Sequence, residues 1–294
     1  NHRESIINLL CGGFVQEAGE SLCGARAVAQ EGGPVGERWV LRHGANHRRG
    51  SMGIQTALRV VYPPRCLSCG DAVESDFGLC GPCWRDTPFI IDPCCDACGA
   101  PLPEGLGDVS GAVMKCDACL DHPRPWVRGR AALLYEGKGR DLVLALKHGD
   151  RHEIVRPAAK WMARRAQFLL APQILVAPIP LHWTRMLKRR FNQSALLAEA
   201  LAHELGLAYC PDLLQRPTRT AQLKGMDHAA RFQELEGAIT VHPKRRHRIA
   251  GRSVLLVDDV LTSGATLHAA TQVCLQAGAK DVRIAALARV AKEA

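Results

Sequence analysis

Residues 254–267 read VLLVDDVLTSGATL, and this segment constrains the fold more than any other. Four aliphatic residues lead into Asp258 and Asp259, a loop rich in Thr, Ser and Gly follows, and a helical pattern then begins. This order predicts a buried strand that enters a loop and a helix. The acids can accept hydrogen bonds from sugar hydroxyls, and the loop can hold a phosphate at a helix N-terminus. The segment therefore predicts a sugar-phosphate site.

Receiver domains offer a rival interpretation, because they also carry acids after an aliphatic strand, where the acids bind Mg2+ and accept a phosphoryl group. Two features of this chain argue against it. The residues after the acids supply hydroxyls and a glycine suited to close approach by a phosphate. The pattern also lies near the C-terminus, whereas a receiver needs most of its domain beyond the acids. The sugar-phosphate interpretation is favoured.

Eight of the 13 cysteines form four C-x2-C pairs between residues 66 and 119. Two thiolates in one tight turn can reach the same ion, and two such turns complete a closed tetrahedral site for a structural zinc. Zinc binding would supply folding energy that so small a segment cannot draw from a core. We expect two zinc ions, held by one set comprising Cys66, Cys69, Cys80 and Cys83 and another comprising Cys95, Cys98, Cys116 and Cys119.

Three alternatives remain open for the cysteines. The two sets could exchange partners in a cross-braced arrangement. Cys94 abuts Cys95 and could replace it as a ligand, although Cys95 alone keeps the two-residue spacing to Cys98. Free or redox-active thiols are the third possibility.

Strands alternate with helices after residue 126, which predicts an α/β domain with a mainly parallel twisted sheet flanked by helices. We expect three parts in the chain. Residues 1–51 are a disordered or non-native extension, residues 52–125 form a double zinc ribbon, and residues 126–294 form the α/β domain. Met52 is the first methionine, so we expect the native protein to begin near it, the alternative being an ordinary flexible tail. We expect strands at 130–135, 174–178, 238–241, 253–258 and 282–290, and helices at 139–147, 153–170, 192–205 and 264–277.

The formal net charge of +9 favours phosphate-bearing ligands or nucleic acid. No apolar run approaches the roughly 18 residues typical of a membrane span. The N-terminus also lacks the order of a signal peptide. A cytoplasmic location is the expectation.

Residues 254–266 resemble, over their whole length, the phosphoribosyl-diphosphate signature of type I phosphoribosyltransferases. The wider layout resembles the ComF family of competence-associated proteins, in which a double zinc ribbon precedes a phosphoribosyltransferase-like domain. This likeness covers about residues 57–291. Weaker motifs occur in the family's order: YPPRC at 62–66, LKHGD at 146–150, PIPL at 178–181, RFNQ at 190–193 and LQR at 214–216.

The resemblance implies roles for particular residues. Asp258 and Asp259 would bind the ribose hydroxyls of phosphoribosyl diphosphate, directly or through Mg2+. A mobile loop at 216–236 would close over the site. The 5′-phosphate would be held by Thr262, Ser263, Gly264, Ala265 and Thr266, and further contacts would come from Arg185, Arg190, Arg216 and Arg231.

The resemblance favours a transferase of pentosyl groups but names no acceptor. Arg190 stands where the family usually has Gly, and Glu234 where it usually has Asn. An alternative is a non-catalytic module that binds single-stranded DNA and assists a DNA helicase or translocase during uptake. Trp84, Trp183 and Phe191 are its candidate stacking residues. A purely structural role would leave Asp258 and the loop after it unexplained.

Overall fold

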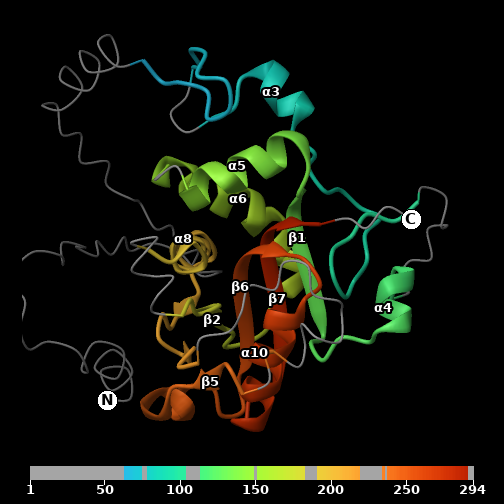
Figure 1. Cartoon of the computed structure of the whole chain (residues 1–294), viewed down its shortest axis with the longest axis vertical. Coiled ribbons are helices and arrows are strands. Elements are labelled where there is room, and N and C mark those ends of the chain that lie inside the picture. The colour runs from blue at the N-terminus through green and yellow to red at the C-terminus, as the bar shows by residue number, and fades with distance from the viewer. Residues whose placement is uncertain are drawn as a thin grey trace, which may run out of the picture. The chain divides into compact units, whose positions relative to one another are not determined.

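The computed structural model describes residues 63–74, 78–103, 113–148, 151–182, 191–218, 234–235 and 237–290 (Figure 1). All of them belong to one compact unit, Ser51–Ala294. The expected extension at 1–51 lies outside the described residues.

Five parallel strands form the main sheet in the order β1-β7-β6-β2-β3. Strand β6 is hydrogen-bonded on both sides, to β7 and to β2. The parallel α/β fold expected from the sequence is confirmed. The strands are β1 Arg128–Leu134, β2 Leu175–Pro178, β3 Ala208–Tyr209, β6 Ser253–Leu261 and β7 Asp281–Arg289.

Helices cover both faces of this sheet (Figure 1). Successive strand residues point to opposite faces, so Leu255 and Val257 join one core cluster while Val254 and Leu256 join the other. The first cluster includes residues of α5 (Gly137–His148), α6 (Val155–Ala166) and α8 (Gln193–Leu205), and the second includes residues of α10 (Ala265–Gln276). Within the described residues, no helix combines the length and apolar character needed to span a membrane.

Several elements differ from the sequence expectation. Thr240–Val241 (β5) pairs antiparallel with Leu214–Gln215 (β4) in a separate two-stranded sheet. The single helix expected at 153–170 is observed as α6 with a short 3-10 turn at each end. These turns are His152–Ile154 (η1) and Gln167–Leu169 (η2). Strand β6 continues three residues past Asp258, because pairing with β7 extends to Leu261. Pro243–Arg248 forms a basic 3-10 turn, η3.

The cysteine-rich region consists of two segments that pack on opposite faces of the sheet. The first cysteine segment (63–74 and 78–86) contains helix α3 (Gly81–Asp86) and places Leu67 in the core with α5 and α6. The second cysteine segment (94–103 and 113–121) contains α4 (Asp117–Asp121) and places Ala97 in the core with α10.

The chain between these segments runs along the outer edge of β1. The Ile90 N–H donates to the Ala132 carbonyl at 2.9 Å, and the Leu134 N–H donates to the Pro88 carbonyl at 2.9 Å. Farther along, the Gly129 N–H donates to the Asp96 carbonyl at 2.8 Å. The edge strand of the sheet is therefore covered by the cysteine-rich region.

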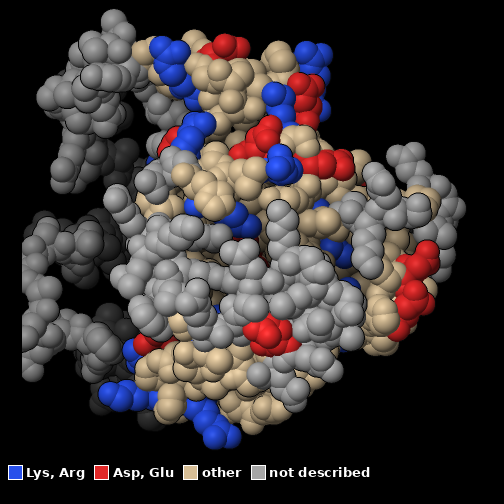
Figure 2. Space-filling model, viewed as in Figure 1, with Lys and Arg blue, Asp and Glu red and all other residues tan. Residues whose placement is uncertain are grey.

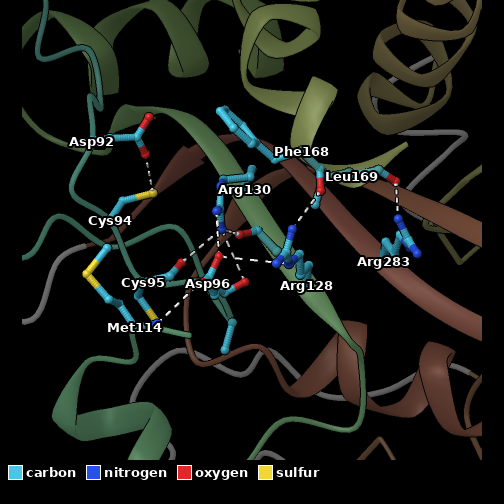
Figure 3. Close-up of polar contacts among 12 residues, drawn as sticks. Asp92, Cys94, Cys95, Asp96, Met114, Arg128, Arg130, Phe168, Leu169 and Arg283 are labelled. Atoms are coloured by element: carbon cyan, nitrogen blue, oxygen red, sulfur yellow. Dashed lines mark hydrogen bonds and ion pairs between the residues drawn. The ribbon is translucent and has the colours of Figure 1, made fainter. Parts of the chain in front are cut away.

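A buried ion pair joins the second cysteine segment to the sheet (Figure 3). The Arg130 Nη2 atom on β1 lies 2.6 Å from Asp96 Oδ1, and the two side chains are 7% and 12% exposed. The other oxygen, Asp96 Oδ2, accepts from the Met114 N–H at 3.0 Å. Asp96 thus links the two parts of the second cysteine segment, 94–103 and 113–121, to each other and to β1.

Replacing Arg130 with Met should lower the free energy of unfolding by about 3 kcal/mol, because buried Asp96 would lose its partner at 2.6 Å and keep only the 3.9 Å contact with the exposed Arg128. Urea unfolding, with zinc content checked in parallel, measures this change. Arg245→Met is the matched control: Arg245 pairs with Asp212 at 2.9 Å, but both side chains are more than 40% exposed. That control should change stability little, since solvent screens the pair. Equal losses in the two variants would contradict the importance of the Arg130 pair.

Candidate functional site

Asp258 and Asp259 lie near the carboxyl end of β6, where side chains from two helices reach them. Lys147 on α5 places its Nζ 3.2 Å from Asp259 Oδ1. Ser194 on α8 donates from Oγ to Asp258 Oδ1 at 2.9 Å. The Asp259 N–H also donates to Asp258 Oδ1, at 2.9 Å. These contacts fix the orientation of both carboxylates.

The start of α8 is held against the ends of two strands. Asn192 caps the helix, because its Oδ1 accepts from the Ser194 N–H at 3.0 Å. Its Nδ2 donates to the Ile179 carbonyl, just past β2, at 3.0 Å. The Ile179 N–H in turn donates to the Val257 carbonyl of β6 at 2.9 Å. The hydroxyl of Ser194 is thereby positioned beside Asp258.

The environment of Asp258 disfavours its charge. Burial and the neighbouring charge of Asp259 raise the pKa of Asp258 to about 7, although Ser194 and Lys147 act in the opposite direction. Asp258 therefore exchanges its proton near neutral pH. A cation bound beside it would favour the ionised form.

A short loop at 262–264 joins β6 to α10, and two residues separate it from Asp259. Gly264 adopts a left-handed conformation, with φ of 84°, immediately before the helix. A Cβ atom at this position would lie 3.1 Å from the Arg124 guanidinium and 3.1 Å from the Trp126 ring. The Ala265 N–H donates to Ser263 Oγ at 3.4 Å. The structure thus brings Thr262 to Thr266 and the paired acids to the same edge of the sheet, at a helix N-terminus.

Of the four predicted arginines, only Arg216 lies within the described part of the chain. Arg216 directly follows β4, and it is 8% exposed. Arg185, Arg190 and Arg231 lie outside the described residues.

Sequence reasoning assigned no role to Lys147, Asn192 or Ser194, although all three belong to the polar network around the acids. Lys147 lies in LKHGD and Asn192 in RFNQ, so both motifs had been noticed without a function. The available signal was that these polar residues lie in or next to the two motifs, at the ends of expected helices. Their partners lie far away in the sequence, which is why spacing alone did not connect them.

The structure gathers the eight C-x2-C cysteines into two groups of four. The groups are Cys66, Cys69, Cys80 and Cys83, and Cys95, Cys98, Cys116 and Cys119. Within each group the sulfur atoms all lie within 4.8 Å of one another. We call these groups the first and the second tetrad. Four thiols at such separations match the donor set of a closed, structural zinc site.

The surroundings of Cys66 in the first tetrad favour its thiolate, the form that binds metal. Backbone N–H groups of Ser68 and Cys80 donate to Cys66 Sγ at 3.4 and 3.3 Å. Burial works against ionisation, but these hydrogen bonds lower the pKa of Cys66 to about 6.

Cys94 occupies a different environment from Cys95. Its Sγ donates to Asp92 Oδ1 at 3.2 Å and accepts from Arg165 at 3.1 Å. Burial raises the pKa of the Cys94 thiol to about 11. Cys95, not Cys94, contributes its sulfur to the second tetrad.

Comparison with known families matches both parts of the chain. Residues 57–120 match the double zinc ribbon domain, and residues 192–294 match the phosphoribosyl transferase domain. The chain is therefore a zinc-ribbon protein that carries a phosphoribosyltransferase domain.

Two relatives match this chain over nearly the whole of their own length. DNA utilization protein YhgH of Salmonella typhimurium is 31% identical over 78% of this chain and 99% of the relative. Competence protein F of Haemophilus influenzae is 26% identical over 76% of this chain and 96% of the relative. A solved structure of APRTase from Giardia lamblia is 21% identical over 49% of this chain and 70% of that one, with a TM-score of 0.31. The chain belongs to the ComF family, which includes YhgH and competence protein F.

The tetrads predict the metal content of variants. Cys95→Ser should reduce bound zinc from two ions per chain, one for each tetrad, to one. Cys94→Ser is the matched control and should leave both ions in place, since Cys94 lies outside the tetrad. Elemental analysis of purified protein measures the content. Loss of zinc in the Cys94 variant and retention in the Cys95 variant would reverse the assignment.

Proposed function

We propose that the phosphoribosyltransferase domain binds phosphoribosyl diphosphate together with Mg2+ and transfers its pentosyl group to an acceptor. The observation that carries this proposal is the position of two oriented carboxylates shortly before a loop at the N-terminus of α10. Family membership supports the same ligand class. We also propose that the protein acts in the cytoplasm.

The two halves of the site would bind different parts of the ligand. Asp258 and Asp259 would accept hydrogen bonds from the ribose hydroxyls. The hydroxyls of Thr262, Ser263 and Thr266, with the loop N–H groups, would donate to the 5′-phosphate. The positive end of α10 would add favourable electrostatic energy.

Charge balance supports the presence of a cation. Asp258 and Asp259 have Lys147 as a counter-ion, and their hydrogen bonds within the described residues engage Oδ1 atoms. Carboxylate oxygen is a donor that Mg2+ accepts, so the pair fits this ion. When bound, Mg2+ would neutralise charge on the diphosphate leaving group. Arg185, Arg190, Arg216 and Arg231 are proposed to contact the ligand as well.

Calorimetry with phosphoribosyl diphosphate and Mg2+ tests the ligand. The wild-type protein should bind, and Asp258→Asn/Asp259→Asn should weaken binding by at least about tenfold, because hydrogen bonds to charged groups are lost. Asp212→Asn is the control, as Asp212 pairs with Arg245 on the surface. No heat with wild-type protein, or equal affinity in the double variant, would remove the proposed ligand.

The raised pKa of Asp258 predicts how binding depends on pH. Asp258 is largely protonated below its pKa of about 7, whereas the ionised form is the one that accepts ribose hydroxyls or a cation. Affinity should therefore fall by about tenfold for each pH unit below this value. Asp258→Asn should remove that dependence and leave the phosphate's own ionisation near pH 6. A pH profile that is the same in both proteins would contradict the role of Asp258.

A second candidate function is binding of single-stranded DNA, alongside a helicase or translocase. It is favoured by the names of two relatives, DNA utilization protein YhgH and competence protein F, and by the net charge of +9. Lys and Arg gather at the η3 end of the molecule (Figure 2). Trp84 is 43% exposed and packs on Phe89 with ring centroids 4.4 Å apart, which leaves part of its surface available for stacking.

If this second function holds, an oligonucleotide should bind with an affinity that falls steeply as salt rises. Trp84→Ala should weaken binding, since stacking contributes about 1–3 kcal/mol per base. Fluorescence anisotropy at several salt concentrations measures both effects. Binding that ignores salt, or that is unchanged in the variant, would argue against a DNA-binding surface at the first cysteine segment.

A further inference from the structure

Two arginines bind three successive carbonyl groups of the loop that joins β6 to α10. Arg289, at the end of β7, donates from Nη1 to the Leu261 carbonyl at 3.1 Å and to the Thr262 carbonyl at 2.7 Å. Arg124 donates from Nη1 to the next carbonyl, that of Ser263, at 2.7 Å. Neither arginine belongs to the signature that predicted the loop.

These bonds determine where the loop N–H groups point. In a planar trans peptide, the carbonyl of one residue and the N–H of the next lie on opposite sides. Because the arginines hold the carbonyls of Leu261, Thr262 and Ser263, the N–H groups that follow each of them are directed away from the guanidinium groups. Successive N–H groups with a common direction form an anion-binding concavity. The arginines thus act from behind the loop, where their positive charge also favours an anion.

Arg124 connects this loop to the second tetrad. Its guanidinium lies 5.6 Å from the centre of the Trp126 ring, and the Trp126 indole donates to the Ala97 carbonyl at 2.5 Å. Ala97 lies inside the turn between Cys95 and Cys98.

The contact between these parts leaves little free space. Gly264 carries no side chain, and a Cβ there would meet both Arg124 and Trp126 at 3.1 Å. Gly99, directly after the Cys95–Cys98 turn, has a φ of 71°, and a Cβ there would lie 2.7 Å from the Ala131 nitrogen. Movement of the second tetrad would therefore be transmitted to the loop through packed atoms.

The first tetrad occupies a different position. Its helix α3 contacts α5, and Arg151 donates to the Leu67 carbonyl at 3.0 Å, on the sheet face opposite α10. The chain therefore offers an internal comparison between two tetrads of the same chemistry.

We propose that Arg124 and Arg289 are positioning residues for the phosphate loop, and that metal occupancy of the second tetrad controls the loop's affinity for phosphate through Arg124. This inference rests on the proposed function of the loop. Coupling between two sites is reciprocal, so a ligand at the loop must also hold the metal in the second tetrad more tightly.

The first test compares three variants by calorimetry with phosphoribosyl diphosphate and Mg2+. Arg124→Met keeps an unbranched apolar stem but removes the guanidinium donors, and it should weaken binding by at least about tenfold. Arg124→Lys keeps a charged donor and should recover part of that loss. Arg252→Met is the matched control, because Arg252 also donates to one backbone carbonyl, that of Gln173 at 2.9 Å, and it should bind like the wild-type protein.

The result separates the two proposals. If the wild-type protein does not bind, the proposed function fails and this inference fails with it. If the wild-type protein binds and Arg124→Met binds equally well, the positioning role alone is overturned. Thermal unfolding and zinc content of each variant show whether a loss reflects the loop or the fold.

The second test measures zinc release to a zinc-selective colorimetric chelator and does not depend on catalysis. Cys69→Ser disables the first tetrad, so the remaining release reports the second. Phosphoribosyl diphosphate with Mg2+ should slow this release, and Arg124→Met in the same background should abolish the slowing. A rate of zinc release that is the same with and without ligand would overturn the coupling. So would slowing by the ligand that persists in the Arg124→Met variant. Arg124→Lys, which keeps a charged donor, should restore part of the slowing in the same background.

Discussion

Strand β6 depends on hydrogen bonds from two neighbours, and the candidate site depends on β6. Both β7 and β2 satisfy the backbone of β6 as far as Val257, and pairing with β7 then carries the strand past Asp258 and Asp259 to Leu261. Two acids in a buried strand would be unfavourable unless their charges had partners. Lys147 and Ser194 supply those partners from helices that the same sheet supports.

The residues that could be predicted from sequence are those whose partners are close in the chain. Asp258, Asp259 and the loop after them occupy one short segment, and each cysteine pair is defined by a spacing of two residues. The parallel sheet followed from alternating strands and helices. Such signals are local, so they remain visible without a structure.

The rest of the site depends on contacts between distant parts of the chain. Lys147 meets Asp259 across more than a hundred residues, and Arg124 meets Ser263 across 139. Nothing in the sequence near Lys147 or Arg124 specifies those partners, because the order of the strands in the sheet creates the encounter. The short β4–β5 pair was not predicted for a related reason: no strand was expected at Leu214–Gln215, and only the second half of the expected strand at 238–241 forms β5. Two-residue strands carry too little periodicity to show which sheet they join.

The covered edge of β1 has a consequence for the protein before it acquires metal. An unprotected edge strand presents free backbone donors and acceptors that can pair with another chain. Here Pro88, Ile90 and Asp96 occupy that edge, and the segments on either side of them are held in shape by the tetrads. At the opposite edge, β3 has two residues and offers little to pair with. Zinc supply would then govern whether newly made chains remain separate in solution.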